Sequence, residues 1–492
     1  MEYLVTGEEM RRFDRDTIEK IGIPAMVLME RAALAALEKV ERHCVKQSGH
    51  VLIMAGVGNN GGDGLALARL LKEKNFDVEI WCVGELSKAS EQWAQQRRIL
   101  ESYEVVFVTQ PHREEYTVMI DALFGVGLSR EITGVCREAV ELFGRLSGYK
   151  IALDLPSGVD SDTGKIWGSA VRVDETVTFG FRKRGLAMYP GCEYAGKVTV
   201  VDIGITQVSF LGALPGMVLC DEHARELLPE RQPDGNKGTF GKVLLIAGSL
   251  NMAGAAVLAA RACYRIGAGM VKIITPEENR VIIQETIPEA LLGTPADLEN
   301  SLEWADVIAL GPGIGKSNEA ARCLEVVLKK SKKPLLIDAD GLNLLAESDD
   351  LRTLLTRQGE EGRKFILTPH VGELSRLTGK SVSKLKENLP ESGMALAKQL
   401  HAIVAAKDAR TFVCGVNYPI CVCLSGNNGM ATAGSGDVLA GAVAGLLAQG
   451  MEPFRAAVAG VRLHSLAGDR VSVQLGEHAC MASSIADALG FE

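Results

Sequence analysis

Short apolar runs alternate with longer amphipathic segments through the first half of the chain. Residues 51–55, Val-Leu-Ile-Met-Ala, are typical of a strand that is buried on both faces. Residues 26–42 instead repeat their apolar side chains at helical spacing, which predicts an amphipathic helix. Further helices are predicted at residues 10–20 and 65–74, and further strands at residues 77–83, 105–108, 118–120, 151–153, 171–179 and 197–202. Strands and helices in alternation predict a doubly wound, mostly parallel sheet.

A second pattern of the same kind begins near Gly241. Strands are predicted at residues 242–247, 270–275, 307–310, 335–338, 365–367, 403–406, 411–414 and 420–424, and a strongly apolar helix at residues 438–447. The segment between the two patterns, residues 206–233, lacks clear periodicity and contains Pro215, Pro229 and Pro233. We therefore predict two doubly wound α/β domains, residues 1–215 and residues 216–492.

The composition fits aliphatic α/β domains and argues against two other classes of protein. Hydrophobic residues make up 47% of the 492 residues, aromatic residues only 5%, and 53 glycines suit many tight strand-to-helix turns. The net charge of −9 argues against a protein that binds nucleic acid through phosphate contacts. The one short basic run, Arg182-Lys183-Arg184, is predicted to be a solvated loop that could also touch a phosphate group. No uncharged apolar stretch reaches the roughly 18 residues that a membrane-spanning helix needs, so no membrane partner is expected.

Cysteine usage and the first residues predict a cytoplasmic location. The 11 cysteines include no CxxC pair, so neither a zinc site nor a thioredoxin-like site is indicated. Cys421 and Cys423 alternate along an apolar run and are predicted to lie in the core. Residues 1–5 lack the charged-then-apolar pattern of a secretion signal. Reduced thiols in the cytoplasm are therefore the expected state.

The segment Gly434-Ser435-Gly436-Asp437 is the most informative motif of the chain, because it opens the apolar helix at residues 438–447. Glycines at a helix start leave backbone N–H groups free to bind an anion, which the helix dipole also favours. An aspartate there would repel a phosphate, unless it accepts a proton from a hydroxyl group that attacks a phosphoryl group. The motif thus predicts a phosphoryl-transfer site, although an aspartate that only stabilises the helix start is an equal alternative for the tetrapeptide alone.

A glycine-rich turn follows the strand at residues 51–55. Residues 56–64, Gly-Val-Gly-Asn-Asn-Gly-Gly-Asp-Gly, contain the GxGxxG pattern that often binds a dinucleotide pyrophosphate. Two features argue against an ordinary dinucleotide site. Asp63 would repel a pyrophosphate, and the acidic residue expected about 20 positions on, Glu79, lies inside a predicted strand. Asn59 and Asn60 offer amides that bind hydroxyl groups, amides or a cation; a plain turn rich in Asn and Gly is the alternative.

Two more loops begin with an aspartate at the carboxyl end of a strand, where α/β sheets present ligands. One begins at Asp121, and the other begins at Asp154 and includes Ser157. Together with residues 56–64 they predict a polar pocket above one sheet. Oxygen-containing groups without a histidine or cysteine cluster favour a hard cation over zinc.

These three loops resemble those of the NAD(P)H-hydrate epimerase family, and the resemblance covers residues 1–205. The sequence differs from the family pattern at Arg31, where asparagine is usual. The resemblance implies a Rossmann-like domain that holds potassium through Asn60, Asp121 and Ser157. Asp121 is then either the group that handles the proton or mainly a potassium ligand. The resemblance also implies that the hydrated nicotinamide nucleotide is lined by Asn59, Asn60, Gly61, Gly62, Asp63, Gly125, Val126, Gly127, Leu128, Ser129, Arg130, Glu131 and Asp154.

Polar and glycine-rich loops also follow the predicted strands of the second half. Glycines at residues 311–315 let a ligand approach the backbone closely. His370 follows another strand, and residues 407–411 bring Lys and Arg to a place where they could meet nucleotide phosphates. A structural turn histidine and a solvated surface lysine are the alternatives for His370 and Lys407. No Walker A motif is present, which argues against a P-loop fold.

In this order the motifs resemble the ADP- or ATP-dependent NAD(P)H-hydrate dehydratase family, a branch of the ribokinase-like fold. The resemblance covers residues 225–490, and residues 428–441 are its most specific piece. Ser435 keeps a hydroxyl group where the family often has threonine. The resemblance implies that substrate is contacted by Ala255, Gly313, His370 and Asp437, and the nucleotide by Lys407, Asp408, Ala409, Arg410, Thr411, Gly434, Ser435 and Gly436.

The order of the two halves resembles the bifunctional NAD(P)H-hydrate repair enzymes. It implies that the first domain interconverts the R and S hydrates of NADH and NADPH, and that the second dehydrates the S hydrate with ADP, giving AMP and phosphate. Asp437 would be the catalytic base there. Potassium is expected in the first domain, magnesium with ADP in the second, and a homo-oligomer overall. Two alternatives stay open: a small-molecule kinase in the second half, and a non-catalytic nucleotide-binding module in the first.

Overall fold

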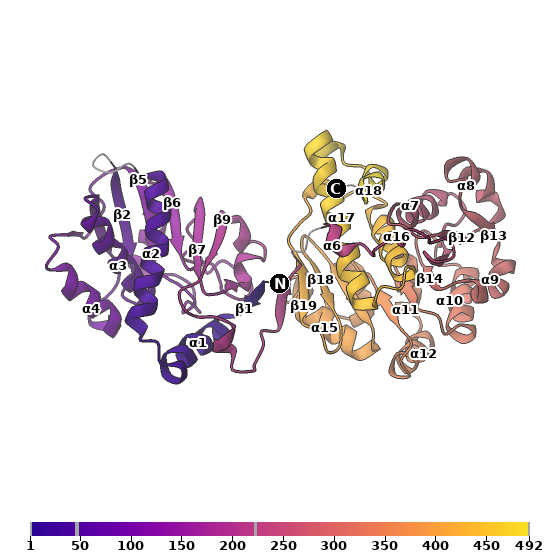
Figure 1. The fold of residues 1–492 in the computed structure, drawn as a ribbon, viewed down its shortest axis with the longest axis horizontal. Helices are drawn as coiled ribbons and strands as arrows, with labels where there is room; N and C mark the ends of the chain where they lie inside the picture. Colours follow the sequence, from indigo (N-terminus) through magenta and orange to yellow (C-terminus); the bar gives the residue numbers. More distant parts are fainter. Residues whose placement is uncertain (1, 45–48, 221–223, 491–492) are drawn as a thin grey trace. The chain divides into compact units, whose positions relative to one another are not determined.

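The computed structural model describes residues 2–44, 49–220 and 224–490. The chain divides into two compact units, Glu2–Met217 and Val218–Glu492, and in each of them helices pack around a sheet (Figure 1). Among the described residues, we find no helix whose length and apolar character would let it cross a membrane.

The N-terminal unit is built on a seven-stranded sheet with the strand order β4-β3-β2-β5-β6-β7-β9. Every pairing between these strands is parallel. The strands are β2 (His50–Ala55), β3 (Asp77–Cys82), β4 (Val106–Val108), β5 (Glu115–Ala122), β6 (Ser147–Leu153), β7 (Glu175–Phe179) and β9 (Lys197–Val201). The helices are α1 (Gly7–Asp16), α2 (Ala25–His43), α3 (Asn59–Glu73), α4 (Glu91–Leu100) and α5 (Gly134–Arg145). A short parallel pair, β1 (Tyr3–Val5) and β8 (Arg182–Lys183), was not predicted from the sequence.

The alternation of side chains along a strand explains why both faces of this sheet are buried. In β2, Val51 and Ile53 pack into a core with α2 and α3, whereas Leu52 and Met54 pack into a second core with α5. Burial of each such side chain stabilises the fold by roughly 1.5–3 kcal/mol. The continuous apolar run at residues 51–55 is thus the consequence of a central strand covered on two sides.

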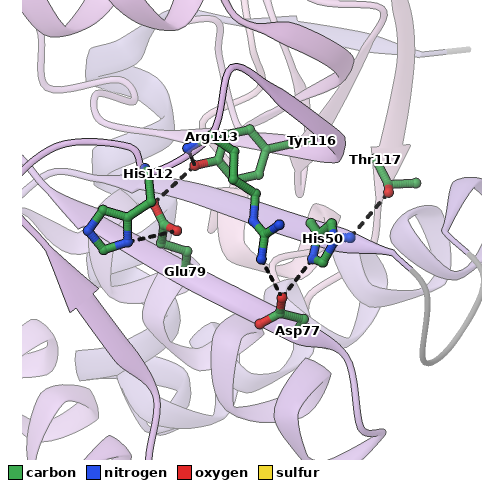
Figure 2. Close-up of polar contacts among 7 residues, drawn as sticks. All are labelled: His50, Asp77, Glu79, His112, Arg113, Tyr116 and Thr117. Atoms are coloured by element: carbon green, nitrogen blue, oxygen red, sulfur yellow. Dashed lines mark hydrogen bonds and ion pairs between the residues drawn. The ribbon is translucent and has the colours of Figure 1, made fainter.

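A polar network links strands β2, β3 and β5 and the loop before β5 (Figure 2). His50 Nδ1 lies 2.6 Å from Asp77 Oδ2, and the hydroxyl group of Tyr116 donates to Glu79 Oε1 at 3.0 Å. The backbone N–H of His112 also donates to Glu79, at 3.0 Å. Because these contacts engage the Glu79 carboxylate, it is not placed to bind a ribose, in agreement with the argument against an ordinary dinucleotide site.

The C-terminal unit contains a larger sheet, with the order β13-β12-β11-β14-β15-β16-β17-β18-β19-β10, in which β10 spans Met217–Leu219 at the start of this unit. Pairings are parallel as far as β17 and antiparallel from β17 to β19. The other strands are β11 (Lys242–Ile246), β12 (Met270–Ile274), β13 (Leu291–Gly293), β14 (Val307–Leu310), β15 (Leu335–Ile337), β16 (Phe365–Leu367), β17 (Ile403–Lys407), β18 (Thr411–Cys414) and β19 (Ile420–Cys423).

Helices cover this second sheet, and the most apolar of them is α16 (Ser435–Ala448), which packs against α7 (Ala253–Arg265) and α17 (Pro453–Leu475). The other helices are α6 (Ala224–Leu227), α8 (Arg280–Thr286), α9 (Leu298–Trp304), α10 (Asn318–Lys330), α11 (Ala339–Glu347), α12 (Asp349–Glu360), α13 (Val371–Thr378), α14 (Val382–Glu387), α15 (Leu389–Leu400) and α18 (Ala482–Ala488). Close contact between α16 and α7 depends on small residues, since a Cβ at Gly441 would lie 2.1 Å from the carbonyl oxygen of Ala259.

Candidate active sites

A cavity of about 930 Å³ lies at the carboxyl ends of the strands in the N-terminal unit. Its walls come from α1, the start of α3, the loop after β5 and the ends of β6 and β8. This edge is where parallel sheets bind ligands, because loops and helix N-termini gather there. The volume suits a small organic molecule, for which cavities of roughly 300–1,000 Å³ are usual.

Close backbone contacts shape the wall formed by residues 56–64. Helix α3 begins at Asn59, so the helix start predicted at residue 65 was wrong and the second half of the glycine-rich segment is helical. A Cβ at Gly61 would lie 1.9 Å from the carbonyl oxygen of Gly56, and a Cβ at Gly64 would lie 2.8 Å from the Cβ of Ala122. Glycine at these positions lets the first turn of α3 approach the sheet, with Asn59 and its neighbours on the cavity wall.

The amide of Asn60 and the carboxylate of Asp121 lie near the same cavity but differ in their contacts. Neither amide atom of Asn60 has a hydrogen-bond partner among the described residues, although both atoms are buried. Asp121 is fully buried and is not among the residues that line the cavity. Its carboxylate accepts hydrogen bonds from Ser157 N (2.7 Å), Ser157 Oγ (2.6 Å) and Leu123 N (3.2 Å). Burial raises the pKa of Asp121 to about 6, and these hydrogen bonds oppose the shift.

Three carboxylates and one ammonium group meet at the cavity: those of Asp14, Asp63, Asp154 and Lys183. Burial raises the pKa of Asp63 well above its usual range, and the negative charge of Asp154 adds to the effect. The pKa of Asp14 is raised for the same two reasons. Both shifts favour the protonated form of these two carboxyl groups, whereas Asp154 is paired with the Lys183 ammonium group.

Helix α1 brings Asp14 to this place, and a capping box explains where that helix begins. Thr6 Oγ1 accepts a hydrogen bond from Glu9 N at 3.1 Å, and the Glu9 carboxylate accepts one from Thr6 N at 2.8 Å. These contacts satisfy two of the backbone N–H groups that a helix start leaves without partners. Asp14 was not singled out from the sequence, where it reads as one polar position of an amphipathic helix.

The loop after β5 contributes backbone more than polar side chains. Gly125, Val126, Gly127, Leu128 and Arg130 line the cavity, whereas Ser129 and Glu131 do not. A Cβ at Gly125 would lie 3.2 Å from Asp154 Oδ2, so glycine leaves room beside that carboxylate.

In the C-terminal unit, Gly434 precedes helix α16 and sets the position of Asp437. Gly434 adopts φ +87°, a left-handed conformation that disfavours other residues, and a Cβ there would lie 2.5 Å from Leu258 Cδ1. The helix begins at Ser435, which leaves Gly436 and Asp437 in its first turn. Backbone N–H groups of this turn have no helical acceptor, so they can bind an anion.

Charged groups surround Asp437 at the carboxyl ends of the strands. Burial raises the pKa of Asp437 to about 7, with a further contribution from Asp338, whereas Lys407 opposes the shift. The Lys407 ammonium group lies 3.0 Å from Asp338 Oδ1, which also accepts a hydrogen bond from Thr368 Oγ1 at 2.6 Å. A Cβ on Gly436 would lie 3.3 Å from Lys407 Nζ, so the lysine is next to the predicted anion-binding turn and is not a solvated surface residue.

His370 combines a structural contact with exposure to solvent. It caps helix α13, since its Nδ1 accepts a hydrogen bond from Gly372 N at 2.9 Å, while the Glu373 carboxylate accepts one from His370 N at 2.8 Å. Its side chain is 55% exposed, and its Nε2 lies 3.4 Å from Glu373 Oε1. Burial raises the pKa of Glu373 to about 7.

Two of the other predicted substrate residues touch each other. A Cβ on Gly313 would lie 2.7 Å from the Cβ of Ala255, so glycine at one position and a small residue at the other let the two segments approach closely. Residues 408–410, Asp-Ala-Arg, form the turn between β17 and β18, with Lys407 and Thr411 paired at its base. Arg410 Nη1 donates to the carbonyl oxygen of Leu424 at 2.5 Å, which holds the arginine beside the following loop.

Two family models match different parts of the chain. Residues 243–489 match the model of NAD(P)H-hydrate dehydratase, and residues 25–185 match the YjeF-related protein N-terminus. A bifunctional NAD(P)H-hydrate repair enzyme from Moorella thermoacetica is 35% identical over 99% of this chain and 96% of its own length. The chain belongs to the family of bifunctional NAD(P)H-hydrate repair enzymes.

Further similarities agree with this family. A repair enzyme from Thermofilum pendens is 36% identical over 95% of this chain and 92% of its own. A solved ribokinase-like superfamily protein from Enterococcus faecalis is 29% identical, with a TM-score of 0.50, over 56% of this chain and 95% of its own. The predicted family, fold class and enzyme class, an isomerase joined to a lyase, are confirmed.

Within this repair-enzyme fold, the sequence prediction for residues 182–184 was wrong. The predicted solvated basic loop is instead largely buried: the Lys183 side chain has no exposed surface, and the Arg182 and Arg184 side chains are 15% and 13% exposed. Lys183 forms strand β8 and lies against the cavity. A run of basic residues is usually solvated, and only the long-range contact with Asp154 reveals the different role.

Proposed function

We propose that the C-terminal unit dehydrates the S hydrate of NADH or NADPH with ADP, and that Asp437 is its catalytic base. The observation that carries this proposal is a carboxylate with a pKa of about 7 in the first turn of a helix whose N–H groups can bind phosphate. Asp437 accepts the proton of the substrate hydroxyl group, whose oxygen then attacks the terminal phosphoryl group of ADP. The C–O bond of the resulting phosphate ester then breaks, and inorganic phosphate leaves with the bonding electrons. The adjacent ring carbon loses a proton to solvent, its C–H electrons restore the ring double bond, and AMP is the second product.

The nucleotide is held by the β17–β18 turn and by the start of α16. Lys407 supplies positive charge next to Gly436, and the N–H groups of the first turn of α16 stabilise charge on the transferring phosphoryl group. Ala255, Gly313 and His370 complete the substrate side of the site. Among the described residues, no three His, Cys, Asp or Glu side chains are grouped so as to hold a metal ion. Magnesium is therefore proposed to enter with the phosphates of ADP, as is usual for this ion.

The N-terminal unit is proposed to interconvert the R and S hydrates, with potassium in its site. Asn60 supports this assignment, because a buried amide without partners costs roughly 1–3 kcal/mol unless a ligand meets it. Asn60, Asp121 and Ser157 offer the oxygen atoms that a hard cation prefers. Asp121 has three hydrogen-bond contacts and no place on the cavity wall, which favours the potassium role over proton transfer. Potassium held by Asn60, Asp121 and Ser157 would supply positive charge that balances the Asp121 carboxylate.

Dehydration is expected to increase with pH through about 7. Asp437 acts as a base only when it is ionised, so kcat/KM should fall about tenfold per pH unit below its pKa of about 7. Replacement of Lys407 by methionine removes the positive charge that favours the ionised form of Asp437. The fall of kcat/KM at low pH should therefore begin at a higher pH than in the wild-type protein. Rates measured from pH 5.5 to 8.5 with S hydrate and saturating ADP test this; a flat profile through pH 7 contradicts the role of Asp437.

Removal of potassium is expected to slow epimerisation and to lower the melting temperature of the N-terminal unit. A ligand present at about 100 times its dissociation constant stabilises the folded state by roughly 2.7 kcal/mol. The measurement compares potassium with a bulky quaternary ammonium salt at equal ionic strength. Asn60→Leu should abolish the difference, whereas dehydration of pure S hydrate should not respond to either change. Equal melting temperatures and rates in both salts would remove potassium from the proposal.

The test of the whole proposal is recovery of reduced nicotinamide absorbance from a mixture of both hydrates with ADP, magnesium and potassium. Complete recovery is the expected result, and ATP in place of ADP identifies the donor. Recovery that stops at the S fraction would overturn the epimerase assignment alone. A stable phosphorylated product would instead favour a kinase.

A cytoplasmic location is part of the proposal, supported by 11 cysteines that are scattered along the sequence without the regular spacing of a disulfide framework. Homo-oligomerisation stays a prediction, which the native mass in solution tests.

A further inference from the structure

Lys183 is the most completely buried charged side chain at the N-terminal cavity, and protein groups satisfy its whole ammonium group. It donates to Asp154 Oδ1, to Thr178 Oγ1 at 3.0 Å and to the carbonyl oxygen of Phe179 at 2.8 Å. An ammonium group has three N–H donors, so none is left for a substrate. Lys183 therefore acts on Asp154 and not on a ligand directly.

Asp154 is held in an unusual conformation by these contacts. Its φ of +68° is rare for a residue with a side chain, and such strain persists only where the surroundings enforce it. Asp154 Oδ1 is occupied by Lys183, with longer contacts to Thr178 Oγ1 and Phe179 N at 3.5 and 3.4 Å. Asp154 Oδ2 accepts no hydrogen bond within the described part of the chain and lies beside Gly125, on the cavity wall. One carboxylate oxygen is thus fixed by the protein and the other is left for the substrate.

We propose that Lys183 is a positioning residue for epimerisation, which holds Asp154 as the proton acceptor of that reaction. The proposal rests on the epimerase function proposed for this unit. Asp63 lines the same cavity and is the matching proton donor, because burial and the negative charge of Asp154 raise its pKa. The cavity thus presents two carboxyl groups in different surroundings: Asp154 is paired with a buried ammonium group, and burial raises the pKa of Asp63. Acid and base catalysis requires such a difference between two groups.

The chemistry follows from the carbon at which the hydrates differ, which carries a hydroxyl group and is bonded to the ring nitrogen. Asp63 gives its proton to the hydroxyl oxygen, the C–O bond breaks, and water leaves with the bonding electrons. The nitrogen lone pair forms a C=N bond, which makes the carbon planar. Water then adds from the other face, its electron pair forms the new C–O bond, and the C=N electrons return to nitrogen. Asp154 takes the released proton, which returns to Asp63 through solvent, so no oxidant or other reactant is consumed.

A second buried lysine in the same unit provides a matched control. Lys39 Nζ lies 2.6 Å from Glu175 Oε1, and both side chains are less than a tenth exposed, at 8% and 5%. Neither residue lines the cavity. Lys39 and Lys183 therefore share burial and an ion pair with a carboxylate, and differ in their distance from the proposed chemistry.

The experiment compares Lys183→Met, Lys183→Arg and Lys39→Met in the full chain, with R hydrate as the substrate. The C-terminal unit dehydrates the S hydrate that forms, under conditions in which epimerisation limits the observed rate. Lys183→Met should lower the epimerisation kcat by about 100-fold with little change in KM. The acid limb of its pH profile should move to higher pH, by about one to three units, because the Asp154 carboxylate loses the charge that favours its ionised form. Lys183→Arg should restore most of the rate and the wild-type limb.

Lys39→Met should lower the melting temperature without changing kcat or the pH profile of the folded protein. If Lys39→Met and Lys183→Met lose activity only in proportion to unfolded protein, Lys183 is structural and the inference is wrong. An unchanged pH profile in folded Lys183→Met overturns it as well. Wild-type protein that fails to epimerise the R hydrate would overturn the epimerase function itself, which keeps the two failures distinct.

Discussion

Asp437→Asn is expected to lower dehydratase turnover by about 10²–10⁴-fold, the usual contribution of a general base. The amide keeps the size of the carboxylate but cannot accept the hydroxyl proton. It also removes a negative charge from the first turn of α16, so ADP should bind at least as tightly as to the wild-type protein. The change therefore separates chemistry from binding.

The measurement is kcat for pure S hydrate, together with the dissociation constant of ADP by calorimetry. Asp487→Asn is the matched control, because Asp487 lies in the same unit but contacts Arg261 and Arg265 on its surface. It should leave both quantities unchanged. Near-wild-type turnover in Asp437→Asn would remove Asp437 from the mechanism, and a lost affinity for ADP with normal turnover at saturation would make it a binding residue.

The dehydratase site could largely be predicted because its decisive part is local in sequence. Gly434 to Asp437 combine a left-handed turn, free helix N–H groups and a carboxylate within four consecutive residues, and the structure joins them to Lys407. What local sequence does not contain is the set of neighbours, such as Asp338, that raises the pKa of Asp437 to about 7. Those neighbours come from separate strands and meet only because parallel strands end at the same edge.

The N-terminal site was harder to predict for the same reason. Asp14, Asp63, Asp154 and Lys183 come from four separate parts of the chain. The loops of Asp63 and Asp154 were predicted to meet in one pocket, whereas nothing in the sequence connected Asp14 and Lys183 with them. Lys183 in particular is flanked in sequence by two arginines, which predicts a solvent-exposed segment. In the structure, however, its side chain is buried. Conversely, Asp121 lies at a strand end, as a catalytic residue often does, but it is fully buried, accepts hydrogen bonds from Ser157 and Leu123, and is not among the residues that line the cavity.

Most strands were predicted because their apolar runs are continuous, although the short strands β1, β8, β10 and β13 were missed. The start of α3 was predicted wrongly. Glycine has low helix propensity, so residues 59–64 predict a turn. The structure places them in the first turns of a helix because tertiary contact with the end of β2 outweighs that propensity. A glycine in the first turns of a helix, despite its low helix propensity, thus indicates a close backbone approach, and replacement by alanine tests that contact.

Gly61→Ala is expected to abolish epimerisation and to destabilise the N-terminal unit. The new Cβ would lie 1.9 Å from the carbonyl oxygen of Gly56 and 2.6 Å from its carbonyl carbon, so backbone must move. Overpacking usually costs about 1–3 kcal/mol and occasionally more; because the obstacle here is backbone, we expect the upper end. The movement displaces Asn60 and Asp63 from the cavity wall, and a displacement of about 1 Å is enough to lower a rate roughly 100-fold.

Gly144→Ala in helix α5 of the same unit is the control, because a Cβ there would meet nothing within 4 Å. It should be neutral or stabilise the unit by about 0.5–1 kcal/mol, through the higher helix propensity of alanine. Thermal unfolding and the R-to-S rate are measured for both variants, and dehydration of pure S hydrate should remain at the wild-type rate in each. A Gly61→Ala protein that epimerises and unfolds like the wild type would show that α3 does not need to approach the sheet so closely, and that the epimerase site does not depend on this contact.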